Sequence, residues 1–278
     1  MTERNLSNEE IMAFQRDGVA LLPQAVAPEW IARLLKVADQ QLANPSEWGK
    51  DGDPEMQQGR MFTDRYLWRK NDAIYDYIKH AGCARLAGQA MQCSSTRFYF
   101  DHLIVKQPNT NLATPWHQDV PYWPFLGKQI CSIWLALTPT TLASSTLEFV
   151  RASHLDDVYY LPARFGSKQS YGDKDWLAGG AKGTPCPDIE AQRDKYDIVS
   201  FDLQPGDALI FSAWTLHGAP GNSTTDQPRM AISTRWLGDD AIWSPRPGAD
   251  PSVNPEHVQV EPGQAPHDNA FFPELWHR

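Results

Sequence analysis

The chain has 278 residues, enough to bury a sizeable core, and its 41% hydrophobic and 21% charged residues are typical of a globular protein. A formal net charge of −9 argues against nucleic-acid binding, because neutralising phosphates requires a basic face. The sequence shows no secretory signal, no apolar run that could span a membrane and no paired cysteine spacing, so we expect free thiols and a cytoplasmic location.

The first 95 residues are predicted to be largely helical. Ser7-Asn8-Glu9-Glu10 has the form of a capping box, which predicts a helix that Gly18 ends. A short strand over 19–22 follows, and Pro28 begins a second helix. Residues 46–70 are polar and interrupted by Gly and Pro, which predicts a loop, whereas 72–92 again has a helical pattern.

From about residue 96 the pattern changes to short apolar runs that are typical of strands. The predicted strands cover residues 97–106, 129–137, 147–150, 197–203, 208–211 and 230–236. Long Pro-rich connections without intervening helices favour an antiparallel sandwich or barrel.

No convincing linker divides the chain, so residues 1–278 are predicted to form one domain. It would consist of a helical part to about residue 95, a barrel core over about 96–240 and an irregular C-terminal tail. Residues 160–195, which are rich in Gly, Lys and Asp, are predicted to be an inserted loop.

A candidate metal site begins with His117 and Asp119. Residues two apart in a strand project from the same face, so both side chains can reach one ion. His217 is the best third ligand, because it follows a Pro-Gly-Asp turn and the predicted strand 208–211. Two imidazoles and one carboxylate leave positions open on a metal, which is the geometry that non-haem Fe(II) oxygenases require.

An isolated His-x-Asp pair is weak evidence, because such pairs arise by chance and a core or surface histidine is commoner. Arg229 favours a metal site over a chance pair, since it follows His217 by twelve residues at the start of another predicted strand. A planar guanidinium near a metal suits bidentate binding of a carboxylate. The order His, Asp, His, Arg therefore favours a functional site.

Three motifs resemble the phytanoyl-CoA dioxygenase family of iron(II)- and 2-oxoglutarate-dependent oxygenases: residues 117–125, 147–154 and 206–233, within a match from Leu6 to about Trp236. The family fold is mainly β, a double-stranded β-helix (a jelly-roll, cupin-like barrel) with flanking helices. The resemblance implies that His117, Asp119 and His217 bind Fe(II) and that Arg229 pairs with the distal carboxylate of 2-oxoglutarate. It also implies that 2-oxoglutarate and O2 become succinate and CO2 while a small organic substrate is oxidised.

The resemblance extends to the cosubstrate pocket. Trp134 matches a Trp that lines this pocket, and His102 and Gln118 fall where family members contact the cosubstrate. A Ser that is common two residues after the distal His is Ala219 here, so one hydrogen bond to the carboxylate is either missing or supplied by another residue. Related halogenases have Ala or Gly where this chain has Asp119, which favours hydroxylation, with desaturation, epoxidation or ring closure as alternative outcomes.

The substrate is predicted to be a small molecule, and strand alternation raises the hypothesis that it is anionic. Alternation places Arg235 on the same face as Arg229, and an inward arginine is costly without an anionic partner. Arg235 is therefore a candidate for binding a substrate carboxylate or phosphonate; the alternatives are a salt bridge to a core acid and a strand end that reaches water.

An aromatic wall near the metal is a further hypothesis, although core packing explains each member alone: Tyr99, Tyr122, Trp123, Phe125 and Trp214.

Two other classes of function compete with the oxygenase. One is a non-oxidative metal enzyme of the cupin kind, an isomerase or hydrolase, which has no need for Arg229 as a carboxylate clamp. The other is a catalytically silent binding protein on the same fold, which would be free to lose the metal ligands. The complete set of three ligands and Arg229 favours the oxygenase over both.

Overall fold

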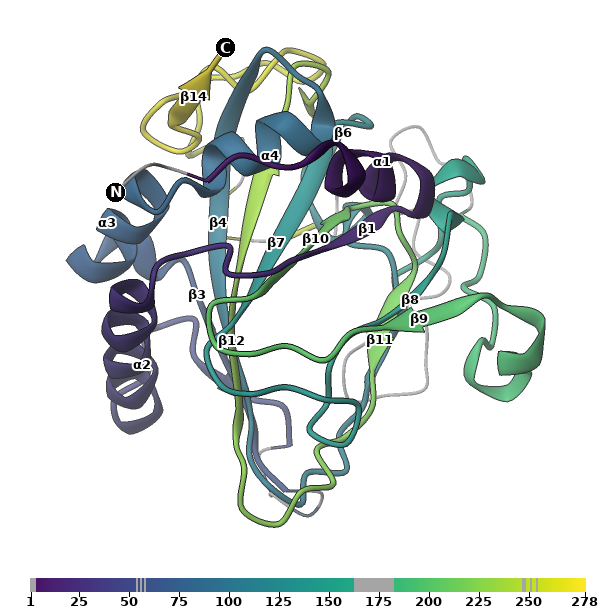
Figure 1. Ribbon diagram of the computed structural model, residues 1–278. Helices are drawn as coiled ribbons and strands as arrows, with labels where there is room; N and C mark the ends of the chain where they lie inside the picture. Colours follow the sequence, from purple (N-terminus) through teal and green to yellow (C-terminus); the bar gives the residue numbers. More distant parts are fainter. Residues whose placement is uncertain are drawn as a thin grey trace.

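Two antiparallel sheets form the body of the protein in this computed structural model, which describes residues 4–53, 55, 57, 59–162, 183–246, 249–250, 252–253 and 255–278 (Figure 1). The major sheet contains β1 (Val19–Leu22), β2 (Lys50–Asp51), β3 (Met61–Arg65), β4 (Ser95–Lys106), β7 (Ile130–Ala136), β10 (Ala208–Ser212), β12 (Arg229–Leu237) and β14 (Glu274–His277). The minor sheet contains β5 (Thr114–His117), β8 (Glu148–Val150), β9 (Ile198–Ser200) and β11 (His217–Ala219). A separate short pair joins β6 (Phe125–Leu126) to β13 (Ile242–Trp243).

The strand order confirms the predicted jelly-roll class. In the major sheet the order is β1-β10-β7-β12-β4-β3-β2, with β14 paired to β4, and in the minor sheet it is β5-β11-β8-β9. An apolar core lies between the two sheets, where Trp134, Leu209 and Phe211 of the major sheet pack with Phe149 and Val199 of the minor sheet. The face of the major sheet toward this core is called the inner face below.

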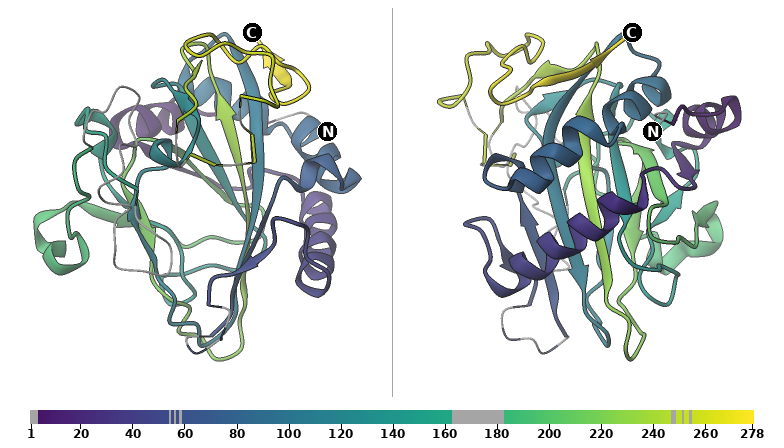
Figure 2. Two further views of the ribbon diagram at one scale, coloured as in Figure 1. Left: turned by 180° about the vertical axis from the view of Figure 1, so that it is seen from behind. Right: turned by 60° about the vertical axis from the view of Figure 1, so that its left-hand side comes forward.

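Helices cover the outer face of the major sheet (Figure 2). They are α1 (Asn8–Asp17), α2 (Pro28–Ala43), α3 (Asp72–His80) and α4 (Cys83–Met91). The predicted capping box at Ser7 is present, and Gly18 ends α1 with φ 78°, a conformation that favours glycine. The single helix predicted over 72–92 is in fact two, because Gly82 has φ 84° and breaks the helical path.

The prediction that residues 46–70 form only a loop was wrong. β3 lies in this segment and pairs with β4, from Met61 opposite Lys106 to Arg65 opposite His102. Its burial alternates, with Phe62 and Asp64 buried toward the outer side. Most strands are recognised by alternating apolar and polar residues. β3 lacks this pattern, because polar residues lie on both of its faces and the inner face of the barrel is itself polar here.

The C-terminal tail is mostly irregular, as predicted, except for the short β13 and for β14 at the end of the chain, which pairs with the start of β4. Of the predicted inserted loop over 160–195, residues 163–182 lie outside the described part of the chain. Its last portion contains the short 3-10 helix η4 (Glu190–Lys195). Elsewhere in the described residues, short 3-10 helices are η1 (Leu67–Arg69), η2 (Val120–Tyr122) and η3 (Ser153–Leu155). Within the described ranges, no helix combines the length and apolar character needed to cross a membrane.

Candidate metal centre

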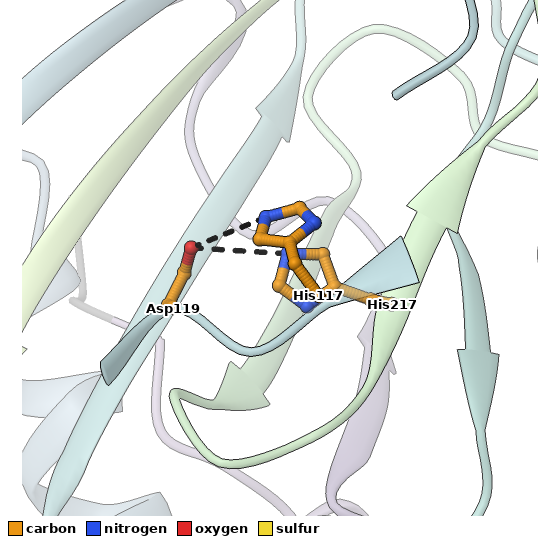
Figure 3. A group of neighbouring side chains, drawn as sticks. All are labelled: His117, Asp119 and His217. Atoms are coloured by element: carbon orange, nitrogen blue, oxygen red, sulfur yellow. Dashed lines mark ion pairs between the residues drawn. The ribbon is translucent and has the colours of Figure 1, made fainter. Parts of the chain in front are cut away.

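His117, Asp119 and His217 converge at one point between the sheets (Figure 3). β5 and β11 pair so that His117 lies directly opposite His217, and their ring centroids are 4.2 Å apart. Oδ1 of Asp119 lies 3.7 Å from Nε2 of His117 and 3.9 Å from Nε2 of His217. The three side chains are buried, and one ligand atom from each lies within 4.8 Å of the others, so they can hold one metal ion.

Asp119 reaches this point by a route that the sequence did not predict. β5 ends at His117, and Asp119 has the helical backbone angles φ −76° and ψ −40° at the start of η2. Its backbone N–H donates to the carbonyl of Ala213 at 2.9 Å, which ties it to the segment before β11. The explanation by i, i+2 alternation within one strand was therefore wrong: the carboxylate turns toward the histidines because the chain leaves the strand.

Each ligand has a hydrogen bond that orients it. Nδ1 of His117 donates to the carbonyl of Pro115 at 2.7 Å, and Nδ1 of His217 donates to the carbonyl of Thr215 at 2.9 Å. Because a carbonyl only accepts, each Nδ1 carries the proton and each Nε2 keeps its lone pair for a metal. Ser132 donates its hydroxyl to Oδ2 of Asp119 at 2.8 Å, which leaves Oδ1 facing the histidines.

The electrostatics of the site favour the protonation states that bind a cation. Burial, helped by the neighbouring His117, lowers the pKa of His217 to about 3, so its imidazole is neutral. Burial opposes ionisation of Asp119, but the adjacent His117 and the nearby His217 and Arg235 together hold its pKa below the usual range. A neutral imidazole and an ionised carboxylate are the forms that ligate divalent metals.

Arg229 lies buried at the far end of the inner face, at the start of β12. Its guanidinium carbon is 5.5 Å from the ring centroid of Trp134. Its contacts to the carbonyl of Ile104 and the hydroxyl of Ser145 are long, at 3.4 and 3.5 Å, and its Nε has no partner among the described residues. Burial lowers its pKa to about 9, and a buried guanidinium without a counter-ion favours an anionic ligand.

The middle of the inner face also carries polar groups that the described part of the chain leaves without partners. Ser233 lies opposite both His102 and Trp134 in the strand register, so the three side chains share this face. The Ser233 hydroxyl and the Trp134 indole N–H are buried and have no hydrogen bond within the described ranges. His102 is half-buried, and burial together with the charges of Arg235 and Arg65 lowers its pKa well below the usual value.

Arg235 lies at the end of the inner face nearest the metal site. It is opposite Ser132, the residue that bonds Asp119, and it is 6% exposed. Its Nη1 donates to the carbonyl of Ser233 at 2.6 Å, and its guanidinium carbon lies 4.7 Å from the ring centroid of Phe100. The alternative of a strand end in water was wrong, and no described acid lies within salt-bridge distance of Arg235.

Gln118 is held by the backbone on either side of it. Its amide donates to the carbonyls of Val158 and Trp214, both at 2.9 Å, and accepts from the N–H of Tyr160 at 3.1 Å. These bonds use both of its amide hydrogens. They show how Gln118 holds the loop around the metal ligands, and its contact with the cosubstrate stays a prediction.

The predicted aromatic residues separate into three environments. Tyr122 lies edge-on to the His117 ring with 5.6 Å between centroids. Tyr99 and Trp123 are buried in an aromatic cluster at the metal end, and the Arg235 guanidinium carbon lies 5.8 Å from the Trp123 ring. Trp214 instead donates its indole N–H to the carbonyl of Gly127, and Lys128 lies over its ring.

Sequence reasoning missed two residues of this region. Ser132 is the one polar residue in the otherwise apolar run 130–137. A hydroxyl side chain in a buried strand could have indicated a residue that bonds a site group. Lys106 ends β4 on the same face as His102, which alternation along the strand could have revealed.

Comparisons with known proteins agree with this fold. The model of the family described as phytanoyl-CoA dioxygenase matches residues 14–231. The multifunctional dioxygenase prhA of Penicillium brasilianum is 24% identical over 238 residues, which cover 82% of this chain and 71% of the fungal protein.

Two solved structures share the fold over nearly the whole chain. The alpha ketoglutarate dependent carbocyclase SnoK from nogalamycin biosynthesis has a TM-score of 0.75 at 18% identity and covers 99% of both chains. EctD from S. alaskensis, solved with 2-oxoglutarate and 5-hydroxyectoine, has a TM-score of 0.68 at 18% identity, covering 96% of this chain and 88% of that one.

Proposed function

The chain belongs to the phytanoyl-CoA dioxygenase family of iron(II)- and 2-oxoglutarate-dependent oxygenases, and from this premise we propose that it hydroxylates a small anionic organic substrate. In this proposal His117, Asp119 and His217 hold the iron, and Arg229 binds the distal carboxylate of 2-oxoglutarate. The single observation that carries it is the convergence of the three ligand atoms within 4.8 Å of one another, from separate parts of the minor sheet and its connections.

The residues present fit both groups. The three ligands have the donor set of a non-haem iron site, and their orienting hydrogen bonds are made by Nδ1 of each histidine and Oδ2 of Asp119 rather than by the converging Nε2 and Oδ1 atoms. When bound, iron(II) and 2-oxoglutarate would supply the oxidising chemistry, in which 2-oxoglutarate becomes succinate and CO2, one oxygen atom of O2 enters succinate and the other converts a C–H of the substrate to C–OH. Arg229 and the N–H of Trp134 are the buried donors that suit the cosubstrate.

The chain's own residues prepare the site for this reaction. The carbonyls of Pro115 and Thr215 keep the two histidines in the metal-binding tautomer, and Ser132 keeps one oxygen of Asp119 directed at the ion. Burial of the ligands excludes bulk water, which strengthens every charge interaction within the site. With Asp119 in place, all three protein ligands are present and hydroxylation is the expected outcome.

Arg235 supports the anionic character of the substrate. It is buried beside Ser132, near the metal end, and its Nε has no partner among the described residues. Its guanidinium carbon lies 4.7 Å from the ring centroid of Phe100 and 5.8 Å from that of Trp123. A carboxylate or phosphonate on the substrate would satisfy this charge and place the rest of the molecule near the iron.

The first experiment tests the class of reaction. Anaerobic addition of Fe(II) and 2-oxoglutarate should give the weak visible charge-transfer band of the bound pair, and His217→Ala should abolish it. A screen of anionic substrate candidates should then show succinate release coupled to a product that gains one oxygen. Absence of the band in the wild-type protein would favour a non-oxidative metal enzyme or a silent binding protein instead.

The second experiment tests Arg235. Once a substrate is found, Arg235→Met should raise its KM by about 10- to 100-fold, the value of a lost charge-assisted hydrogen bond, while the 2-oxoglutarate KM stays near that of the wild type. An effect on 2-oxoglutarate alone would assign Arg235 to the cosubstrate.

We further propose the cytoplasm as the compartment, which the four unpaired cysteines support.

A further inference from the structure

Thr215 lies between the candidate metal centre and the end of helix α1. Its backbone carbonyl accepts the Nδ1–H bond of His217 at 2.9 Å, and its hydroxyl donates to the carbonyl of Gly18, also at 2.9 Å. Thr215 is fully buried, so bulk water cannot replace either bond. One residue of the connection between β10 and β11 therefore joins a proposed metal ligand to the residue that ends α1.

The contact with the end of α1 is close and leaves no room for another side chain. Gly18 has φ 78°, and a Cβ added there would collide with Oγ1 of Thr215 and lie 2.6 Å from Nδ1 of His154. The Gly18 carbonyl also accepts from the backbone N–H of Ser212, the last residue of β10. The end of α1 is thus bonded at two points to the chain that leads to His217.

The carbonyl that His217 uses belongs to the peptide group between Thr215 and Leu216. The N–H of this peptide group donates to the hydroxyl of Ser153 at 2.9 Å, and the N–H of Thr215 itself donates to the carbonyl of Ser212 at 2.9 Å. A planar peptide group that is bonded at both edges has little freedom to rotate. The direction of its carbonyl, and with it the orientation of the His217 ring, therefore depends on how firmly Thr215 is held.

We propose that Thr215 is a positioning residue for the metal centre, whose hydroxyl, anchored to the end of α1, holds the carbonyl that keeps His217 in the metal-binding tautomer. This inference rests on the proposed function, because that function assigns His217 to the iron. The competing explanation is that the hydroxyl only satisfies a carbonyl at the end of α1 and contributes to stability alone.

Substitutions of Thr215 separate these explanations. Thr215→Val keeps the shape of the side chain and removes the hydroxyl, whereas Thr215→Ser keeps the hydroxyl and removes the methyl group. Thr215→Ala is a second variant without the hydroxyl, for the case that Val prevents folding. Thr96→Val is the matched control, because Thr96 is also fully buried and donates to a helix carbonyl, that of Ala84 in α4, at 3.0 Å.

Two measurements are made on each variant. Long-range proton–nitrogen NMR with isotope-labelled histidine reports the tautomer of His217 in the metal-free protein, and His217→Ala identifies its signals. Calorimetry with Mn(II) reports the metal affinity.

If Thr215 positions His217, both variants without the hydroxyl should show a mixed or broadened tautomer signal for His217. Their metal affinity should fall by about 10-fold, the lower end of the range for outer partners of metal ligands. Thr215→Ser should keep the Nδ1–H tautomer and bind Mn(II) within about 3-fold of the wild type, because the bond to Gly18 is retained. Thr96→Val should do the same, although it also loses a buried hydrogen bond.

Two results would overturn the inference. A single Nδ1–H tautomer with wild-type metal affinity in the variants without the hydroxyl would show that Thr215 acts only on α1. Equal changes in Thr96→Val would trace the effect to general stability. A wild-type protein that binds no metal would contradict the proposed function, but the tautomer of the metal-free protein still shows whether Thr215 orients His217, so the two failures are distinguishable.

Discussion

The two ends of the inner face differ in how completely the chain satisfies its own polar groups. At the metal end, His117, His217 and Asp119 each receive or donate a hydrogen bond that fixes their orientation. At the far end, Arg229 and Lys106 are buried side by side without a described counter-ion. The side chains proposed to bind the metal are thus oriented by the chain's own hydrogen bonds, whereas the far end has two buried cations that an anionic ligand would neutralise.

The largest expected effect is the loss of a metal ligand. His217→Ala removes one of three protein ligands, so metal affinity should fall by more than about 100-fold, beyond the loss seen when only an outer partner of a ligand is removed. Calorimetry with Mn(II) or anaerobic Fe(II) measures this, and circular dichroism checks that the fold is retained. His257→Ala, far along the chain and outside the site, is the histidine control. Retained metal affinity in His217→Ala would contradict the assignment of the centre.

Arg229→Met should weaken 2-oxoglutarate binding by about 100-fold, because it removes one partner of a buried charged pair. The same change should raise the free energy of unfolding of the ligand-free protein by about 1 kcal/mol or more, since an apolar side chain replaces an uncompensated buried cation. Calorimetry and denaturant titration measure the two effects. A variant that is destabilised without ligand would show that the chain already satisfies Arg229, and the contrast between the two ends would disappear.

Saturating 2-oxoglutarate should stabilise the wild-type protein and leave Arg229→Met nearly unchanged. A ligand at about 100 times its Kd adds about 2.7 kcal/mol to the free energy of unfolding. Thermal unfolding with and without 2-oxoglutarate, in the presence of Mn(II), tests this coupling directly. A similar shift in both proteins would place the ligand away from Arg229.

Ser132→Ala tests the metal end of the inner face by removing a hydrogen-bond partner of a proposed metal ligand rather than the ligand itself. Loss of the hydroxyl that holds Oδ2 of Asp119 should reduce metal affinity by about 10-fold, the lower range for partners of metal ligands. 2-Oxoglutarate binding to the metal-saturated variant should stay close to that of the wild type. Ser95→Ala, at the exposed start of β4, is a suitable control, and an unchanged metal affinity in Ser132→Ala would show that Asp119 needs no support.

The smallest expected effect comes from Ala219→Ser, which restores the residue common in the family. The added hydroxyl should raise 2-oxoglutarate affinity by about 3- to 10-fold, the usual value of one hydrogen bond. Calorimetry on the anaerobic iron-loaded protein measures this change. An unchanged affinity would show that the residue two after His217 does not contact the cosubstrate.

Much of the architecture could be predicted from periodicity and local signals. The capping box at Ser7, the stop at Gly18 and the long strand ending at Lys106 are encoded within a few residues of where they act. β3 could not be recognised, because its inward residues face a polar interior and its outward Asp64 is buried. Pairing with β4 on one side and β2 on the other makes that segment a strand.

For the site, the sequence by itself determined which residue types were present and in what order: two histidines, an aspartate and an arginine. Tertiary structure alone decided how they meet. Asp119 lies beyond the end of β5, where its backbone N–H bonds the carbonyl of Ala213. Pairing of β5 with β11 places two histidines that are 100 residues apart in the sequence opposite each other. Lys106 became visible as a neighbour of Arg229 only through the register of β4 and β12. The physical reason is that side-chain identity is local, whereas burial and the distance between charges depend on strand pairing across the whole chain.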